Sequence, residues 1–240
     1  MNQMNKSNAL IKTSIISIIT SLIATGIASI FSLLKLRDIP LILIAFLFLA
    51  FAIYFFLWRR EIMSYGINSI DEPHTSLDMN LQMENCQKNF DFFGVSARTI
   101  LDAQGGQTIK KKVIDNPNVK IRFLLLDPNE DEIGKKRAQD ETGNENDWTA
   151  WKQIISASID ELKTIKADIN SANIEVRVYS ETPIFRAITI DEETMYLNYY
   201  GKGFRPSETP NLSISKKDIS IFNALEANFN RVWNSSKVML

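Results

Sequence analysis

The sequence predicts a pair of N-terminal transmembrane helices followed by an α/β domain. Two long stretches near the N-terminus carry no formal charge, and strand-like and helix-like segments alternate in the remainder. Charge also divides the chain, because residues 1–60 hold six basic and one acidic side chains, whereas residues 61–240 hold 21 basic and 27 acidic ones. We therefore expect a membrane hairpin at 1–60, a linker with a connecting helix at 61–89 and a cytosolic α/β domain at 90–240.

The first element is a helical hairpin formed by the two uncharged stretches. Residues 13–34 supply 22 uncharged residues and residues 39–58 supply 20, and a bilayer core requires a helix of about 20 apolar residues. Only four residues separate the stretches, which is enough for a tight turn between antiparallel helices. A cleaved signal peptide is the rival interpretation of the first stretch, but its apolar region would span only about 7–15 residues.

The charges that flank the stretches orient the hairpin. Two lysines precede the first stretch and Arg59 and Arg60 follow the second, whereas the turn holds only Lys35 and Arg37. Because basic residues gather on the cytoplasmic side, we expect a multi-pass membrane protein with both termini and the C-terminal domain in the cytoplasm. The single cysteine agrees with a reducing compartment.

The first stretch carries a stripe of small hydroxyl side chains at helical spacing. Its members are Ser14, Ser17, Ser21, Thr25, Ser29 and Ser32. Small polar residues allow transmembrane helices to pack closely, so one interpretation is packing against the second stretch or another copy. The other is that several copies assemble, as a homo-oligomer in the bilayer, with the stripe lining a polar path. The uncharged stretches offer no ionisable residue for a pump or transporter.

The linker at 61–89 is not expected to form one continuous helix between the membrane hairpin and the α/β domain. Gly66 and the sequence Asp71-Glu72-Pro73 interrupt any helix that leaves the membrane. A short helix is expected from Thr75 or Ser76 towards Asn89. The only histidine, His74, falls in the break and is interpreted as an ordinary loop residue.

The remainder reads as alternating strands and helices. Strands are expected at 90–95, 119–126, 174–179, 184–190, 194–200 and 212–215. Helices are expected near 97–102 and 110–115, and Gly105–Gly106 is expected to interrupt regular structure between them. Further helices are expected from Asp147 to Ile169 and at 217–233. Residues 129–146 are polar and are expected to form a loop, and Asp191-Glu192-Glu193 is expected at a hairpin tip. About 150 residues are enough for a core.

Several kinds of chemistry are excluded by residue counts. One cysteine and one histidine allow neither an intramolecular disulfide nor a cysteine-based zinc site, so no metal and no cofactor is expected. The common glycine-rich phosphate loops are absent from the sequence. The mildly acidic C-terminal part argues against nucleic-acid binding through a broad basic surface.

The order of the elements resembles one phospholipase D-like domain over about residues 80–235. The catalytic signature of that superfamily, H-x-K-x4-D followed by a glycine-containing turn, falls here on Ile184, Arg186 and Asp191, with Gly201-Lys202-Gly203 downstream. The segments FFGVS, RFLLLDP, EVRVY and AITIDEETMYLNYYGKG also look like catalytically degenerate relatives. Isoleucine replaces the family's nucleophilic histidine, and it cannot attack phosphorus, so no catalytic residue is expected.

What the resemblance still implies is a pocket that holds an anion without reacting with it. The candidate ligand-binding residues are Arg186, Lys202 and Arg205, with Arg137 from the polar segment as a fourth. Arginine keeps the positive charge at the family's lysine position. The competing interpretation of all four is solvated surface charge.

The two-helix hairpin joined to a small cytosolic α/β domain resembles membrane effectors of bacterial antiphage defence, such as retrons and cyclic-oligonucleotide systems. The resemblance implies a toxin that a cytosolic partner or ligand holds inactive and that permeabilises the inner membrane when released. The partner would be a reverse transcriptase with its DNA–RNA product, or the ligand a nucleotide. The alternatives are a membrane-anchored, non-catalytic sensor or scaffold and a membrane-tethered phosphodiesterase or nuclease, which the missing histidine disfavours.

Overall fold

The computed structural model describes residues 39–64, 67–71, 79–102, 104–205, 208–216 and 221–240, together with Ser21 and Thr25. The chain divides into two compact units, Met1–Arg59 and Arg60–Leu240.

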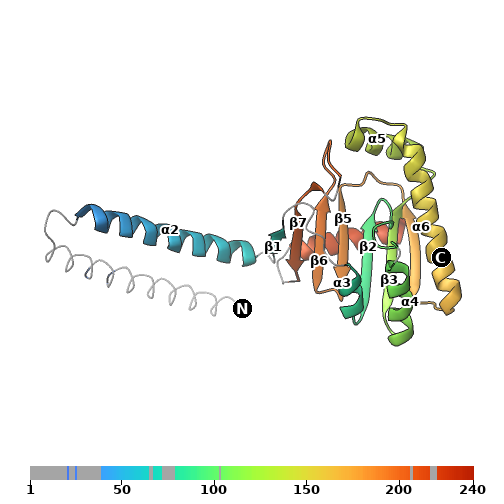
Figure 1. The fold of residues 1–240 in the computed structure, drawn as a ribbon, viewed down its shortest axis with the longest axis horizontal. Coiled ribbons are helices and arrows are strands. Elements are labelled where there is room, and N and C mark those ends of the chain that lie inside the picture. The colour runs from blue at the N-terminus through green and yellow to red at the C-terminus, as the bar shows by residue number, and fades with distance from the viewer. Residues whose placement is uncertain are drawn as a thin grey trace, which may run out of the picture. The chain divides into compact units, whose positions relative to one another are not determined.

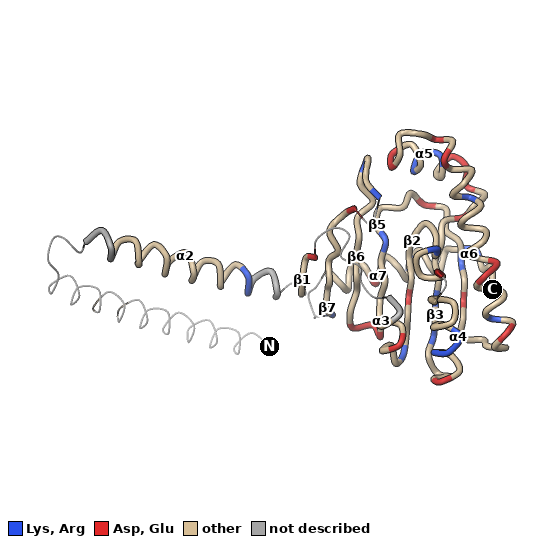
Figure 2. The backbone as a smooth tube through the Cα atoms, in the orientation of Figure 1, with Lys and Arg blue, Asp and Glu red and all other residues tan. Residues whose placement is uncertain are grey.

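Helix α2 spans Ile39–Ser64, and its long uncharged part, mostly tan in Figure 2, lies in the N-terminal unit. Pro40 is tolerated because its missing N–H lies in the first turn, where no intrahelical partner is needed. The bulky apolar side chains between Leu43 and Trp58 are exposed on every side of the helix. Among the described residues one helix is long and apolar enough to cross a membrane, over Leu43–Arg60.

Most of the first expected span lies outside the described residues, so the two-helix hairpin stays a prediction. Within the hydroxyl stripe, only Ser21 and Thr25 are described. Both are helical and exposed, and the Thr25 hydroxyl donates a hydrogen bond to the Ser21 carbonyl oxygen at 2.9 Å. Ser14, Ser17, Ser29 and Ser32 are not described.

The second unit is an α/β domain around a mixed sheet of eight described strands (Figure 1). The strands are β1 Ile67–Asp71, β2 Asn89–Gly94, β3 Lys120–Leu126, β4 Ile174–Tyr179, β5 Phe185–Ile190, β6 Thr194–Tyr199, β7 Asn211–Ser215 and β8 Lys237–Val238. Their order across the sheet is β1-β7-β6-β5-β2-β3-β4-β8. Strands β2, β3 and β4 run parallel, and every other pairing is antiparallel.

Helices cover both faces of this sheet (Figure 1). They are α3 Met79–Asn85, α4 Gly105–Asp115, α5 Asp131–Thr142, α6 Asp147–Ile169 and α7 Ile221–Ser235. Helices α4 and α6 lie on one face and α7 on the other (Figure 1). Because side chains alternate along a strand, Phe92 and Phe123 pack on the first face, whereas Phe93 contacts Phe229 of α7 on the second.

A buried ion pair connects two central strands beneath α7. Asp91 of β2 lies opposite Arg122 of β3 and is only 4% exposed. The Arg122 Nε and Nη2 atoms donate to the two carboxylate oxygens at 2.6 and 2.5 Å. The same guanidinium lies over the rings of Phe229 and Trp233, 4.9 and 5.2 Å from their centroids. The pair therefore ties β2, β3 and α7 together.

The six strands expected from the sequence are confirmed to within one residue at each end, and so is the long helix that starts at Asp147. The final helix is confirmed over Ile221–Ser235, whereas residues 217–220 are not described. In the linker, α3 occupies part of the expected helix, and His74 is not described. The structure also places two strands that the sequence did not indicate, β1 within the linker and β8 at the C-terminus.

The expected loop at 129–146 was wrong, because this segment contains α5. The buried residues of α5 are Gly134, Arg137 and Ala138, so the sequence has no apolar stripe that would predict this helix. A Cβ on Gly134 would lie 2.2 Å from the Trp148 ring, which shows how closely α5 approaches α6. The indole N–H of Trp148 also donates to Asp131 at 2.9 Å. Tertiary contacts with Trp148 therefore hold a helix that its own pattern did not predict.

The expected helix at 97–102 and the break at Gly105–Gly106 were also wrong. Residues 98–102 form turns only, and α4 begins at Gly105. A carboxylate oxygen of Asp102 accepts from the backbone N–H of Gly105 at 3.1 Å, which satisfies one donor at the start of the helix. Glycine is needed there because a Cβ would lie 1.6 Å from the Ile100 carbonyl oxygen.

The tip of the β5–β6 hairpin is confirmed at residues 191–193. Asp191 and Glu192 both adopt positive φ, at 55° and 57°, as the tight turn of a two-stranded hairpin requires. The Asp191 carboxylate accepts backbone N–H groups of Gln87, Lys88 and Asn89. This carboxylate anchors the segment that leads into β2, and backbone hydrogen bonding lowers its pKa against the opposing effect of burial.

Cys86 is expected to resist alkylation in the folded protein. Burial, with a further contribution from nearby Asp191, raises the pKa of its thiol to about 12. Because the thiolate is the reactive species, iodoacetamide at pH 8 should modify the folded chain ~1000-fold more slowly than the chain in guanidinium chloride. Mass spectrometry of timed samples measures both rates, and similar rates would contradict the buried position.

Candidate functional site

The candidate site lies where the strand order of the sheet reverses. From β2 the chain moves outward through β3 to β4 and then returns to place β5 on the other side of β2. A crevice at this edge lies at the carboxyl ends of the parallel strands β2 and β3, beside the start of the antiparallel β5, and ligands commonly bind at the carboxyl ends of parallel strands. The loop that follows β2 begins at Val95, at this edge.

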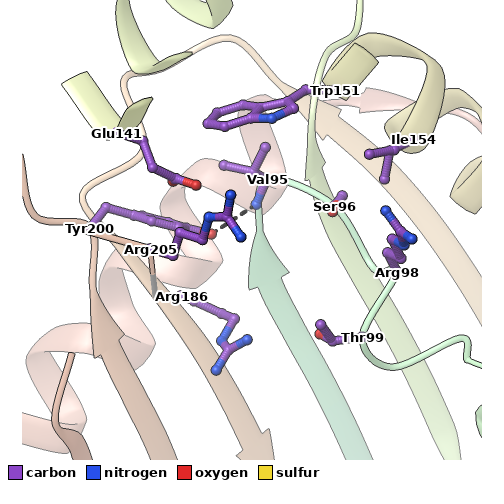
Figure 3. A pocket seen from close by; sticks show the side chains of 10 residues that line it. All are labelled: Val95, Ser96, Arg98, Thr99, Glu141, Trp151, Ile154, Arg186, Tyr200 and Arg205. Atoms are coloured by element: carbon purple, nitrogen blue, oxygen red, sulfur yellow. Dashed lines mark hydrogen bonds between the residues drawn. The ribbon is translucent and has the colours of Figure 1, made fainter. Parts of the chain in front are cut away.

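A pocket of about 370 Å³ occupies that crevice. It is lined by Val95, Ser96, Arg98, Thr99, Glu141, Trp151, Ile154, Arg186, Tyr200 and Arg205. Figure 3 shows three arginines around it, with the indole of Trp151 across one side. The lining comes from the β2 loop, the end of α5, one face of α6, and β5 with the segment that follows β6. The pocket therefore draws on segments that are far apart in sequence.

Arg186 of β5 is a half-buried cation in this pocket. Its Nε and Nη2 atoms donate to the Asn198 amide oxygen at 3.2 and 2.6 Å, which is a neutral acceptor. Burial lowers the pKa of Arg186, so the surroundings disfavour its charge. Among the ion pairs of the described residues, none involves Arg186. A cation held this way would gain from an anion in the pocket.

Two further arginines lie at the rim of the pocket. Arg98 belongs to the loop after β2, and Arg205 belongs to the segment after β6. Both side chains are exposed, and the backbone N–H of Arg205 donates to the Glu208 carboxylate at 2.7 Å. Arginine offers planar, bidentate donors that match phosphate oxygens. Together with Arg186, these residues give the pocket a cationic lining.

Arg137 lies behind the pocket and is not part of its lining. It is 4% exposed and forms an ion pair with Glu141 one helical turn away. Its guanidinium also lies over the Tyr200 ring, 4.7 Å from the centroid, and donates to the Gly201 carbonyl oxygen at 3.3 Å. The arrangement positions Glu141 and Tyr200 rather than offering a charge to a ligand.

Tyr200 and Glu141 form one wall of the pocket. The Tyr200 hydroxyl oxygen accepts the backbone N–H of Val95 at 3.0 Å (Figure 3). Gly94 permits this approach, because a Cβ there would lie 3.3 Å from the same oxygen. Burial raises the pKa of Glu141, although Arg137 and Arg205 oppose the shift. Glu141 is therefore the one acidic side chain of a lining that otherwise favours anions.

Lys202 lies in an exposed turn after β6 and does not line the pocket. Gly203 of the same turn has φ 75°, and its N–H donates to the Asp140 carbonyl oxygen at 2.6 Å. The turn is thus fastened to the end of α5. Of the four cations expected from the sequence, the structure brings Arg186 and Arg205 into one pocket.

The signature-like spacing of Ile184, Arg186 and Asp191 does not form one site. Asp191 lies at the far end of β5 from Arg186 and binds backbone N–H groups of 87–89. Ile184 immediately precedes β5 and is 63% exposed. Its aliphatic side chain offers neither a nucleophile nor a proton-transfer group.

Sequence reasoning missed Arg98 and Trp151 as lining residues. Arg98 follows the first predicted strand by a few residues, so the rule that ligands bind at the carboxyl ends of parallel strands was a usable signal. Trp151 lies within the helix expected from Asp147 to Ile169, and its sequence context gave no signal of a pocket. It is half-buried, and its ring borders both the core and the pocket (Figure 3).

Neither a protein-family model nor a curated protein matches the sequence. Solved structures similar to it include the archaeal chromatin protein TrmBL2 (TM-score 0.44, 13% identity), with 70% of this chain and 52% of that one covered. They also include Nuc, a phospholipase D family member from Salmonella typhimurium, with a TM-score of 0.40 and 10% identity. That match covers 67% of this chain and 87% of Nuc. A third is a phosphatidylserine synthase of Haemophilus influenzae Rd KW20, with a TM-score of 0.46 and 12% identity. That match covers 71% of this chain and 39% of the synthase.

The chain spans about half the length of the archaeal protein that it resembles. A member of the phospholipase D family is thus among the structures similar to this mixed α/β domain. With 10–13% identity and TM-scores of 0.40–0.46, these similarities assign no activity to the chain.

Proposed function

We propose that the chain is a membrane-anchored, non-catalytic receptor for a phosphate-bearing ligand. The observation that carries the proposal is Arg186, a half-buried guanidinium that lines the pocket and whose described hydrogen bonds go to the neutral Asn198 amide. A phosphate group would supply the missing negative charge, and guanidinium–phosphate hydrogen bonds are among the strong ones in proteins. Arg98 and Arg205 at the rim add to the attraction.

The non-catalytic part of the proposal rests on Ile184. The side chain at the position of the family's nucleophile is aliphatic and exposed. Ser96 and Thr99, which line the pocket, have hydroxyl groups but no histidine beside them in that lining. A serine or threonine hydroxyl is a weak nucleophile without a neighbouring base. The site is therefore better suited to holding a phosphate than to cleaving one.

The Arg186→Met variant should lose phosphate binding by at least tenfold, because a charge-assisted hydrogen bond contributes about 1.5–3 kcal/mol. The measurement is isothermal titration of the full chain in detergent micelles with inorganic phosphate. Arg231→Met is the matched control, since that arginine lies on α7, away from the pocket, with its side chain 63% exposed. Near-UV circular dichroism checks that each variant is folded.

Equal phosphate affinity in the wild type and the Arg186→Met variant would contradict the receptor proposal. Hydrolysis of bis-p-nitrophenyl phosphate by the wild type, lost in the same variant, would replace it with the phosphodiesterase alternative. A scaffold without a ligand would bind no phosphate in either form.

We also propose that the receptor acts on the bilayer as an effector. Helix α2 supports this proposal, because its described side chains from Leu43 to Trp58 are bulky, apolar and exposed on all sides. Such a helix is suited to lipid. In this proposal a cytosolic partner, such as a reverse transcriptase with its DNA–RNA product, or a bound nucleotide restrains the N-terminal helices. Release would allow several copies to assemble and make the inner membrane permeable.

A further inference from the structure

The anion pocket adjoins a second hollow along α6. This second hollow, of about 550 Å³, is lined by Arg98, Thr99, Leu101, Asp102, Ile154, Ala157, Ser158 and Glu161. Arg98, Thr99 and Ile154 line both hollows. The two hollows are therefore adjacent, and we call them together the α6 groove. An inorganic phosphate would occupy only the end of it near Arg186.

The α6 groove follows one face of its helix. Trp151, Ile154, Ser158 and Glu161 are three or four residues apart, a spacing that places side chains on the same side of a helix. Ten residues separate the first from the last, which corresponds to ~15 Å along the helix axis. A ligand that fills the groove is therefore elongated and considerably larger than a phosphate group.

The two ends of the groove have opposite chemistry. Arg186 and Arg205 line the first hollow only, whereas Asp102 and Glu161 line the second only. An extended polyanion would be repelled by these carboxylates. A ligand with a phosphate at one end and hydrogen-bond donors at the other would satisfy both ends.

Glu161 is the acceptor that remains available at the second end. The Asp102 carboxylate already accepts backbone N–H groups at the start of α4, including that of Gly105 at 3.1 Å. None of the hydrogen bonds described for residues 104–205 uses the Glu161 carboxylate. A Cβ on Gly106 would lie 3.0 Å from Glu161 Oε1, so glycine at this position leaves room for the carboxylate. Leu101 and Ile154 supply apolar surface beside it.

We propose that the α6 groove binds a nucleotide whose base carries an exocyclic amine. The phosphate lies against Arg186 and Arg205, the sugar passes Arg98 and Thr99, and the amine donates a hydrogen bond to Glu161. The base packs on Leu101 and Ile154. This inference rests on the proposed anion receptor and adds the class of ligand.

The test compares four probes against the full chain in detergent micelles: AMP, IMP, ribose 5-phosphate and inorganic phosphate. IMP has a carbonyl oxygen where AMP has the 6-amino donor, and in the same pose that oxygen would face the Glu161 carboxylate, so AMP should bind about tenfold more tightly. Both nucleotides should bind more tightly than ribose 5-phosphate. Isothermal titration supplies all four affinities.

Glu161→Leu should remove the preference for AMP over IMP and leave the affinity for ribose 5-phosphate unchanged. Asp160→Leu is the matched control, since Asp160 is the preceding residue of α6, is exposed and lies outside the groove. Both positions are on the surface of the domain, so neither substitution should prevent folding.

The outcomes separate this inference from the proposal on which it rests. If phosphate and ribose 5-phosphate bind through Arg186 but AMP binds no more tightly than IMP, the nucleotide assignment is overturned and the anion receptor stands. A preference for AMP that persists in Glu161→Leu also overturns it. Phosphoethanolamine, titrated as a fifth probe, would overturn the nucleotide assignment in favour of a lipid head group if it bound more tightly than AMP. If none of the phosphate-bearing probes binds, both proposals fail.

Discussion

Replacing Asp91 with alanine is expected to reduce the free energy of unfolding of the α/β domain by about 3 kcal/mol, because it leaves the half-buried Arg122 guanidinium without its counter-charge. The guanidinium packs between the Asp91 carboxylate and the rings of Phe229 and Trp233, and only 23% of its side chain is exposed, so water replaces the lost carboxylate only in part. The loss is a large fraction of the 5–15 kcal/mol that typically stabilises a domain. Urea unfolding of the full chain in micelles, followed by tryptophan fluorescence, measures it.

Two controls separate the contribution of charge to stability from the contribution of side-chain packing. Asp168→Ala removes a surface ion pair with Lys110, whose partners are 50% and 26% exposed, and should change stability by less than about 1 kcal/mol. The double variant Asp91→Leu with Arg122→Met replaces both charges by apolar groups and should recover most of the lost stability. Equal instability of the single and double variants would show that the carboxylate contributes by shape rather than by charge.

If the effector proposal holds, expression of the full chain without the proposed cytosolic partner is expected to admit propidium iodide into bacterial cells and to stop their growth. The physical reason is the stripe of hydroxyl side chains in the first uncharged stretch. When several copies assemble, this stripe would line a water-filled path through the bilayer. Replacing Ser17, Ser21 and Thr25 together with leucine should restore growth and exclude the dye. Flow cytometry with a membrane-potential dye measures both effects.

The matched control replaces Ile15, Ile19 and Ile23, on the opposite side of the expected helix, with leucine. This variant keeps the hydroxyl stripe and should remain toxic. Membrane fractionation must show equal insertion of all three proteins. A fully inserted wild-type chain that leaves permeability unchanged would rule out the effector and favour an anchored receptor without lethal activity.

The sheet was predictable because its strands are either continuously apolar or follow a period of two. VKIRFLLL and FDFFGV have this character, and both lie at the buried centre of the sheet. Strand β1 lacks it, since the sequence Ile-Asn-Ser-Ile-Asp is half polar and gains its structure from pairing with β7. Helix α5 was missed for the same reason, because the contact of Gly134 with Trp148 is not visible as a local pattern.

The candidate site was predictable only in part. Arg186 and Arg205 were candidates through the resemblance to a phospholipase D-like domain, whereas Asp191, which completes the signature spacing, lies at the hairpin tip where the sequence predicted it. Lys202 and Arg137 are close in sequence to the right segments, but the turn at Gly203 and the Glu141 ion pair direct them elsewhere. Glu161 lines the groove through tertiary placement alone, whereas Arg98 follows a parallel strand and could have been found from that position. Sequence spacing thus identifies residues that share a strand better than residues that share a cavity.

The lateral edges of the eight-stranded sheet bear on how copies of this protein behave when crowded. One edge is β1, five residues long with a shift of register between Ile67 and Ser69, and the other is β8, only two residues long. Short and irregular edges are poor templates for strand addition, which is how natural proteins avoid aggregating edge to edge. Concentrating many chains in a bilayer therefore carries little risk of amyloid-like polymerisation through this sheet, and any ordered assembly would have to use other surfaces.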